Sequence, residues 1–367
     1  MDQERISLMA LRFVPGVGDF LLKQLVSYCG SADQVFKQSN AKLLKIPGIG
    51  AITAESIHRG KAFHQAEKEF KKAATEDTQI FFFTDKAYPA RLKNIEDAPS
   101  MLYVKGNINL NQVKAVGIVG TRQATTYGKE QVEQLMEGLV PHQPLIISGL
   151  AYGIDIHAHK QALKHGLPTV GVLGSGMDII YPAAHKETAR KMMNHGALVT
   201  ENHFGTLPDA HNFPARNRII AGLCDALIVV EAAQKGGALI TAEIANTYNK
   251  DVFAIPGDLG NLFSEGCNKL IKINKAHLLT SVKDIEYIMN WKLKEEKSEI
   301  QLTLDLPRFE GSEQLVLKAM LEKKTAIMID ELSLKTGIDQ GMLSSILLEL
   351  EFKNAVVSLP GKRYKLG

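Results

Sequence analysis

The segment AVGIVG at residues 115–120 is the first of several short apolar runs that decide the fold. Runs of the same kind follow at LIIS (145–148), TVGVLG (169–174), ALVT (197–200), ALIVVEA (226–232) and VFAIP (252–256). Such runs, rich in Val, Ile and Leu and separated by stretches of helical length, are typical of buried parallel strands joined by right-handed crossovers. We therefore expect an α/β fold with a doubly wound, mostly parallel sheet over residues 78–290.

Composition sets the outer limits on function. The chain has 367 residues, 45% of them hydrophobic and 23% charged, which suits two or three globular domains. The net charge is only +3, so any basic binding site must be local. Cys29, Cys224 and Cys267 lie far apart, which disfavours a disulfide framework, a zinc site and a redox pair. With no signal-peptide pattern and no long apolar run, we expect a cytoplasmic protein that does not enter the membrane.

Residues 1–75 read as a helical domain with two similar interruptions, VPGVG at 14–18 and IPGIG at 46–50. This pattern is typical of helix-hairpin-helix modules, in which glycine amides and the following helix N-terminus can face a DNA phosphate. Tight turns without any DNA contact explain the pattern equally well. The residues that would make such contacts are Gly16, Gly18, Gly48 and Gly50.

The C-terminal part of the chain reads as a separate unit. Residues 291–312 are charged and lack a helical stripe, so they are interpreted as a linker in which QLTLDL could still pair as a strand. Residues 313–367 show three helical patterns and then AVVSLPGKRYKL, which is the outline of a winged helix. The third helix is apolar and acidic, which favours protein interaction or self-association over base reading.

Ligands of open parallel sheets bind at the carboxyl ends of the strands, where the strand order reverses. The first apolar run ends in Gly120, Thr121 and Arg122, a small-residue turn with a charged guanidinium that suits an anion. The turn is neither GxGxxG nor a Walker A loop, so a dinucleotide or NTP hydrolysis is not indicated. An arginine paired with a carboxylate at the sheet edge is the alternative interpretation.

The next two strand ends add further candidates. Ser148 and Gly149 would form part of an amide-lined floor, and Gly174 allows close approach of the backbone. Lys186 would bring a charge to the same mouth, although a solvated surface lysine is the ordinary interpretation. His157 and His159 are spaced i,i+2 and would point to different faces of a helix, so we expect no metal site.

The densest signal is NFPARNRIIAG at residues 212–222. Pro214 suits the first turn of a helix, which places Arg216, Asn217 and Arg218 near a positive helix start with Phe213 just before it. A ring beside two guanidiniums can stack a base while the cations hold phosphates. The alternative divides this set, with Phe213 in the core and Arg218 in an ion pair.

A catalytic set is not recognisable. Glu243, in the run GGALITAE at 236–243, could act as an acid or base, but no second carboxylate, Ser-His pair or Cys-His pair lies near it in the sequence. Turns that suit phosphates, without groups for proton transfer, favour binding of a polyanion over its conversion. We expect no cofactor.

These same motifs closely resemble the DNA-processing protein A (DprA, or Smf) family. The resemblance rests on GTRQATTYG (120–128), SGLAYGIDIHAH (148–159), GVLGSGMDIIYPAAH (171–185), TENHFGTLPDAHNFPARNRIIAGLCDALIVVEA (200–232), KGGALITAEIA (235–245) and DVFAIPG (251–257). It covers about residues 78–285 and implies an extended Rossmann-like domain between the helix-hairpin-helix and winged-helix segments. In many family members a serine precedes the motif arginine, and here Thr121 retains the hydroxyl.

The resemblance implies a function as well. The family binds single-stranded DNA (ssDNA) without catalysis, forms a homodimer and loads a RecA-type recombinase during natural transformation and recombination. The ssDNA site that it implies comprises Thr121, Arg122, Ser148, Gly149, Lys186, Phe213, Arg216 and Arg218. The implied dimer and recombinase surface would include Ile240, Leu270, Ile271 and Ile273.

Two alternatives stay open at this level. The run GGALITAE also resembles the PGGxGTxxE loop of nucleotide phosphoribohydrolases, which would make Glu243 catalytic, although the glycine before Thr241 is missing and Thr241 to Glu243 is one residue short. A third interpretation makes the terminal modules duplex-DNA readers and the central domain a scaffold.

Overall fold

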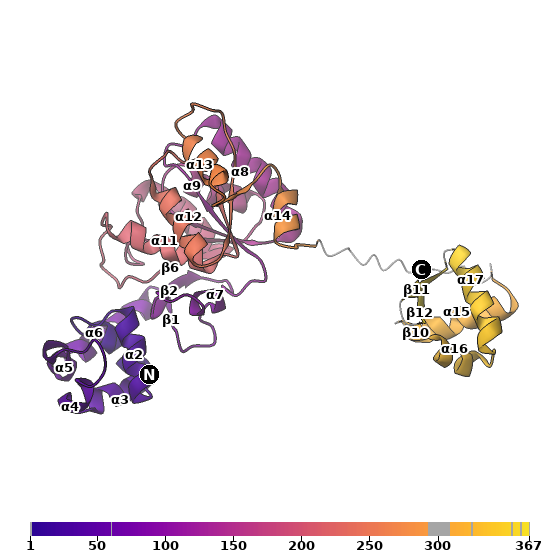
Figure 1. Cartoon of the computed structure of the whole chain (residues 1–367). Helices are drawn as coiled ribbons and strands as arrows, with labels where there is room; N and C mark the ends of the chain where they lie inside the picture. The colour runs from indigo at the N-terminus through magenta and orange to yellow at the C-terminus, as the bar shows by residue number, and fades with distance from the viewer. Residues whose placement is uncertain are drawn as a thin grey trace. The chain divides into compact units, whose positions relative to one another are not determined.

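The computed structural model describes residues 2–59, 61–292, 309–323, 326–353, 355–359 and 362–366. By internal contacts the chain divides into two units, residues 1–291 and 292–367 (Figure 1). The first unit holds both the helical segment and the sheet. Most of the stretch that the sequence predicts as a linker, including QLTLDL, lies outside the described residues.

The centre of the first unit is a nine-stranded sheet in the order β1-β2-β6-β5-β4-β3-β7-β8-β9. The strands run over β1 Gln79–Phe82, β2 Met101–Gly106, β3 Ala115–Val119, β4 Leu145–Gly149, β5 Thr169–Val172, β6 Gly196–Thr200, β7 Ala226–Val229, β8 Asp251–Ala254 and β9 His277–Leu278. The six strands that the apolar runs predict, β3 to β8, pair in parallel. The predicted doubly wound sheet is confirmed.

Three strands were not predicted from the sequence. Strands β1 and β2 add an antiparallel pair beside β6, and β9 extends the other edge after β8. Because β3 lies between β4 and β7, the chain proceeds outward from β3 in both directions. The carboxyl end of β3 is therefore the point where the strand order reverses, which is where open α/β sheets bind ligands.

Helices cover both faces of the sheet (Figure 1). They run over α7 Ala90–Lys93, α8 Thr126–Leu139, α9 Ile154–Lys164, α10 Lys186–Asn194, α11 Asn212–Leu223, α12 Gly237–Thr247, α13 Glu265–Lys272 and α14 Val282–Ile288. Helices α11 and α12 share one apolar core with the strands, whereas α8 and α9 share another on the opposite face. The strand residues are buried on both sides, which explains their continuous apolar character.

The N-terminal helical segment packs on the β1 and β2 side of the same unit. Its helices are α1 Gln3–Arg12, α2 Asp19–Cys29, α3 Ala32–Lys37, α4 Asn40–Leu43, α5 Ala51–His58 and α6 Lys61–Thr75. Gly16 and Gly48 both have a φ of +83°, the left-handed conformation that the two similar hairpins require. The core of this segment continues into Phe82, Met101 and Tyr103 of the sheet.

The second unit has the outline of a winged helix. Helices α15 Gly311–Lys323, α16 Ile329–Thr336 and α17 Gln340–Phe352 precede the ribbon of β11 Val356–Leu359 and β12 Arg363–Leu366, and β10 Ile327–Met328 completes a small sheet. Asp339 caps α17 by accepting hydrogen bonds from the amides of Gly341 and Met342. None of the helices in the described residues is long and apolar enough to cross a membrane.

Candidate nucleic-acid interface

A groove of about 800 Å³ opens at the carboxyl ends of β3 and β7. Its lining comes from the turn after β3, the first turn of α11 and the turn before α12. These segments are far apart in the sequence and meet because their strands are neighbours at the reversal of strand order. We call this the strand-end groove.

The turn after β3 holds Arg122 at the edge of the groove. The amide of Thr121 donates to the carbonyl oxygen of Glu231 at 2.7 Å, and the hydroxyl of Thr121 accepts from the amide of Gln123 at 3.1 Å. Glu231 is buried and accepts hydrogen bonds from Thr125, the residue that caps α8. The turn is therefore fixed from both sides, while the Arg122 side chain is exposed.

Aromatic rings lie beside this arginine. The guanidinium carbon of Arg122 lies 5.6 Å from the ring centre of Phe213, within the range of a cation–π contact. The Phe213 ring lies 5.8 Å from the ring of Tyr181, whose side chain is 49% exposed. A Cβ atom on Gly174 would come within 3.0 Å of the Phe213 ring, so glycine allows this ring to lie against the end of β5.

The floor of the groove contains a buried charge. Arg216 is 5% exposed and donates to the carbonyl oxygen of Val172. A Cβ atom on Gly149 would lie 2.4 Å from the Asp155 carboxylate and 2.7 Å from the Arg216 guanidinium. Glycine at 149 therefore leaves the space in which these opposite charges approach each other. Burial raises the pKa of Asp155 to about 6, although the Arg216 charge opposes the shift.

This pKa gives a stability prediction with a definite sign. The folded state keeps the Asp155 proton up to about pH 6, whereas the unfolded chain loses it near the usual value of 3.8. The Asp155 side chain therefore makes its full contribution to the free energy of unfolding below pH 3.8. This contribution falls by up to about 3 kcal/mol as the pH rises from 3.8 to about 6. We expect the stability difference between the wild type and Asp155→Asn to fall in this way in urea unfolding at a series of pH values. A difference that stays constant from pH 4 to pH 7 would contradict it.

Ser148 and His159 lie beneath the floor rather than in the groove. Both are fully buried, and the Ser148 hydroxyl donates to the carbonyl oxygen of Ile118 at 2.5 Å. His159 Nε2 lies 2.6 Å from the Gly149 carbonyl oxygen, which can only accept, so this nitrogen carries the proton. Burial lowers the pKa of His159 to about 4 and keeps the ring neutral at pH 7. Neither residue is placed to contact a ligand bound in the groove.

The structure brings most of the sequence-predicted site together. Besides Arg122, Phe213 and Arg216, the groove is lined by Gly120, Thr121 and Asn217, whereas Gly174 lines the narrow pocket under Tyr181. Lys186 is exposed at the start of α10 and does not line the groove. The sequence also predicts Arg218 in this set, and the structure places it elsewhere.

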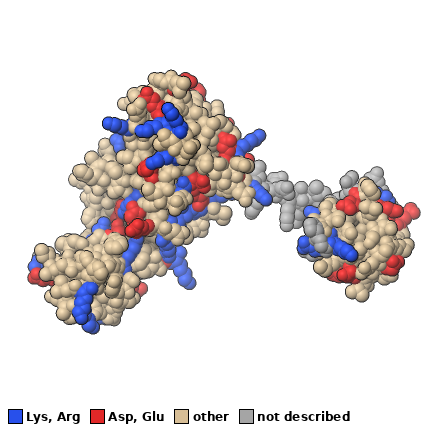
Figure 2. Space-filling view, in the orientation of Figure 1, with Lys and Arg blue, Asp and Glu red and all other residues tan. Residues whose placement is uncertain are grey.

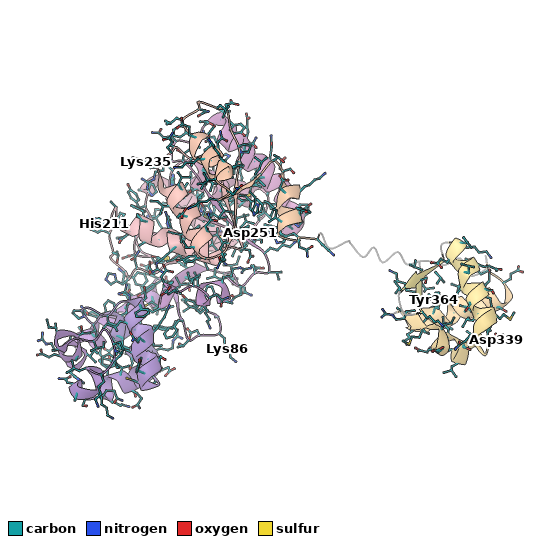
Figure 3. The ribbon with its side chains drawn as sticks, in the orientation of Figure 1. Lys86, His211, Lys235, Asp251, Asp339 and Tyr364 are labelled. Carbon is teal, nitrogen blue, oxygen red and sulfur yellow. The ribbon has the colours of Figure 1, made fainter. Side chains whose placement is uncertain are left out.

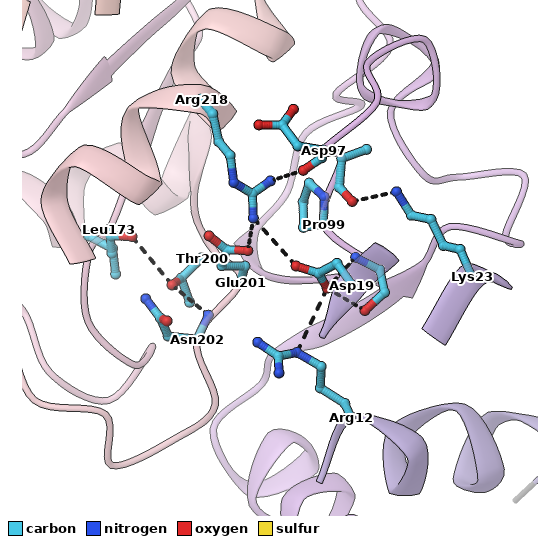
Figure 4. Close-up of polar contacts among 12 residues, drawn as sticks. Arg12, Asp19, Lys23, Asp97, Pro99, Leu173, Thr200, Glu201, Asn202 and Arg218 are labelled. Atoms are coloured by element: carbon cyan, nitrogen blue, oxygen red, sulfur yellow. Dashed lines mark hydrogen bonds and ion pairs between the residues drawn. The ribbon is translucent and has the colours of Figure 1, made fainter. Parts of the chain in front are cut away.

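Arg218 faces the N-terminal helical segment (Figure 4). Its guanidinium pairs with Glu201 and, at 3.5 Å, with Asp19 at the start of α2, and it donates to the carbonyl oxygen of Asp97. Its side chain is 15% exposed. Burial raises the pKa of Glu201, which the Arg218 charge opposes. Arg218 therefore joins the helical segment to the sheet, as the alternative interpretation of this residue anticipated.

Replacing Arg218 by alanine tests this placement. The change leaves the carboxylates of Glu201 and Asp19 without their shared partner, and we expect the free energy of unfolding to fall by about 2 kcal/mol, less than for a fully buried pair because both ends keep some exposure. Affinity for an oligonucleotide that binds in the groove should stay within about 3-fold of wild type, since the guanidinium lies outside the groove. Thermal unfolding and fluorescence anisotropy measure the two quantities. Unchanged stability together with a large loss of affinity would show that Arg218 contacts the ligand and does not stabilise the junction.

The sequence interpretation missed three residues at the groove. Tyr181 and Tyr152 are half-exposed rings beside it, and Lys235 lines it just before α12. Figure 3 shows Lys235 and His211 on the same side of the sheet unit. Tyr152 lies in SGLAYGIDIHAH, Tyr181 lies in GVLGSGMDIIYPAAH, and Lys235 is the first residue of KGGALITAEIA. The glycines next to these residues were the sequence feature that could have identified them as part of the site. Lysines and arginines are interspersed with acidic residues on the face drawn in Figure 2, which agrees with a local site rather than a basic surface.

Glu243 does not line the groove. It is on α12 with a side chain that is 54% exposed, and both of its oxygens accept from Lys275, at 2.6 and 2.7 Å. The phosphoribohydrolase alternative requires this carboxylate beside the phosphate-binding turns. The structure does not supply that geometry.

The apolar residues expected at a dimer or recombinase surface divide into two groups. Ile240 and Ile273 are 46% and 47% exposed and remain available to a partner. Leu270 is 6% exposed and packs in the core behind α13, and Ile271 is partly buried against the same core. Ile240 is on α12, Leu270 and Ile271 are on α13 and Ile273 follows α13, so only the packing of these segments distinguishes the exposed residues from the buried ones.

The two N-terminal hairpins have different surroundings. Gly16 and Gly18 line a hollow of about 620 Å³ that Tyr103, Glu201 and His203 complete from the sheet side. The first hairpin therefore faces the rest of its own unit. Gly48 and Gly50 do not line this hollow, and Ile52, close to the second hairpin, is 82% exposed.

The fold and the groove define an α/β protein with a cationic, aromatic-lined site at the strand ends, carried between helix-hairpin-helix and winged-helix modules. Family models agree: DNA recombination-mediator protein A matches residues 79–290, the DprA winged helix domain matches 305–362 and a SAM-like helix-hairpin-helix tandem matches 8–60. The chain belongs to the DprA/Smf family of DNA recombination-mediator proteins.

Individual relatives support this assignment along the whole chain. Protein Smf of Synechocystis is 31% identical over 99% of both chains, and DprA of Streptococcus pneumoniae is 42% identical over 59% of this chain and 75% of the relative. The X-ray structure of the Streptococcus pneumoniae protein matches 80% of this chain and 99% of its own with a TM-score of 0.70 and 35% identity. A Helicobacter pylori DprA structure, described in terms of its single-stranded DNA binding mode, matches 58% of this chain and 95% of its own with a TM-score of 0.53 and 27% identity.

Proposed function

We propose that the strand-end groove binds single-stranded DNA without cleaving it. The observation that carries the proposal is the meeting of Arg122, Phe213 and Lys235 in one open groove whose floor contains the buried Arg216. Cations along a groove hold phosphates, and exposed rings stack on bases of any sequence. A duplex would not present its base faces to Phe213 and Tyr181, so these rings favour a single strand.

The contact set is narrower than the sequence suggests. We propose backbone approach at Gly120 and Thr121, phosphate contacts at Arg122 and Lys235, and stacking at Phe213 with Tyr181 beside it. Arg216 supplies positive potential from below, and its neighbour Asn217 donates to the Gly237 carbonyl oxygen at 3.4 Å, which joins α11 to the turn before α12. Ser148 and Gly149 support the floor.

The test is binding of fluorescent oligo-dT to the full chain at several salt concentrations, with a duplex of the same length as competitor. Phosphate contacts predict that the logarithm of affinity falls linearly with the logarithm of salt concentration, by about 0.7 for each phosphate held. Duplex that displaces oligo-dT as well as unlabelled oligo-dT does would reject the proposal. A chain without residues 311–367, which belong to the second unit, would then show whether the winged helix reads duplex.

We further propose that the bound strand is passed to a RecA-type recombinase and that the protein acts as a homodimer in natural transformation. Ile240 and Ile273 are exposed apolar residues that suit such contacts, and Ile240 also lines the strand-end groove. Light scattering of the wild type against Ile240→Glu tests the dimer. Strand exchange by RecA on ssDNA already coated with single-strand-binding protein, with and without this chain, tests the loading step.

A further inference from the structure

A second hollow, of about 470 Å³, adjoins the strand-end groove. It lies over the start of α8 and the first turns of α9, and we call it the α8–α9 hollow. Arg122 and Gln123 line both the hollow and the groove. The two surfaces are therefore continuous at Arg122, and a strand in the groove has an exit in this direction.

The hollow carries its own cations. Lys129 on α8 and Lys160 on α9 line it, and both side chains are exposed. Together with Arg122, these two lysines make three positive side chains, from three separate segments, around one concave surface. Such an arrangement suits consecutive phosphates better than it suits one small anion, because the charges are spread along the surface.

One carboxylate beside the hollow, that of Glu133, offsets part of this charge and leaves the three cations in excess. The Glu133 carboxylate accepts from Gln161 Nε2 at 2.8 Å and lies 3.6 Å from His157 Nε2. Burial lowers the pKa of His157, so its ring adds no charge near pH 7. The same His157 nitrogen lies 3.2 Å from the carbonyl oxygen of Lys129, which ties α9 to α8 below the hollow.

An exposed ring completes the surface. Tyr152 lines the α8–α9 hollow and also the narrow pocket under Tyr181. Its ring lies edge-on against His185 with centres 4.7 Å apart, and the side chain is 51% exposed. The contact with His185 orients the ring, and the exposed part is free to stack on a base.

We propose that the α8–α9 hollow is a second ssDNA subsite, in which Lys129 and Lys160 hold the phosphates of the strand that leaves the groove over Arg122, with Tyr152 stacked on a base. The inference rests on the proposed function and adds the direction of the strand. Short oligonucleotides occupy the groove alone, whereas longer ones occupy both surfaces.

The experiment compares Lys129→Glu, Lys160→Glu and Lys164→Glu in the full chain. Lys164 is an exposed lysine one turn further along α9 that does not line the hollow, so it controls for the charge change. Anisotropy is measured with labelled oligo-dT of about six and about 25 nucleotides at several salt concentrations. For the long oligonucleotide we expect each hollow variant to lose about 10-fold in affinity and about 0.7 in salt slope. For the short one, and for Lys164→Glu with either, the change should stay below about 3-fold.

Two results would overturn the second subsite. One is a Lys160→Glu variant that binds long oligo-dT as Lys164→Glu does, and the other is an equal loss for short and long strands, which indicates a general field effect. Failure of the groove itself has a different signature, because Arg122→Ala would then bind the short oligonucleotide normally.

Discussion

Replacing Arg122 by alanine is expected to lower the affinity for a short oligo-dT by about 30- to 100-fold. The guanidinium is exposed at the point where the groove and the α8–α9 hollow meet, so the variant loses a charge-assisted phosphate contact of about 1.5–3 kcal/mol and its cation–π neighbour Phe213. The fold should persist, because the side chain is not part of the core. Fluorescence anisotropy gives the affinity, and far-ultraviolet circular dichroism confirms the fold.

Arg190→Ala is the matched control for this change. Arg190 is also an exposed arginine, on α10, where it pairs with Glu187 at 3.3 Å and does not line the groove. Its loss should leave oligo-dT affinity within about 2-fold. If Arg122→Ala and Arg190→Ala bind alike, Arg122 has no special part in binding and the groove assignment is wrong.

A methyl group at Gly153 is expected to have the largest structural effect at the site. Gly153 has a φ of +78°, which other residues rarely adopt, and a Cβ there would lie 2.2 Å from the Thr121 carbonyl oxygen and 2.6 Å from the Arg122 carbonyl carbon. Both contacts are with backbone, so no rotamer change can relieve them. We expect Gly153→Ala to lower the free energy of unfolding by about 4 kcal/mol and to displace the turn that carries Arg122. Urea unfolding measures the first effect, and loss of oligo-dT binding below the transition reports the second.

Gly166→Ala provides the comparison. Gly166 also has a positive φ, of +67°, but a Cβ there meets no heavy atom within 4 Å. This variant should lose only about 1 kcal/mol, from backbone strain, and bind ssDNA normally. Equal losses at the two positions would show that conformation alone, and not contact with the Arg122 turn, determines the effect at Gly153.

Much of the fold could be predicted because buried parallel strands have a simple pattern. The six apolar runs from 115–120 to 252–256 are the strands β3 to β8, since a strand covered by helices on both faces must be apolar at nearly every position. The three missed strands have two different explanations. Strands β1 and β2 contain the apolar residues IFF (80–82) and MLYV (101–104), which the sequence interpretation passed over, whereas β9 has only two residues, both exposed.

The neighbouring arginines of α11 show what the sequence could not decide. Arg216 and Arg218 are two positions apart on a helix, so they face different directions. Isoleucines and small residues follow them, and the helix is buried on several sides, so its sequence has no single polar stripe to show which face meets the groove. In the structure Arg216 faces the floor beside Asp155, while Arg218 faces Glu201 and the helical segment.

The amino-acid sequence by itself determined the parallel sheet, the paired hairpins, the winged-helix outline and the family, because all of these depend on local patterns and motifs. Only the tertiary structure decided which motif residues share one surface. It brought Lys235 and Tyr181 to the groove, placed Arg218 at an internal junction and joined Lys129 and Lys160 to the exit at Arg122. The physical reason is that a binding surface depends on which strand ends are neighbours and on which face each helix turns to the sheet, and both are fixed by packing between segments distant in the chain.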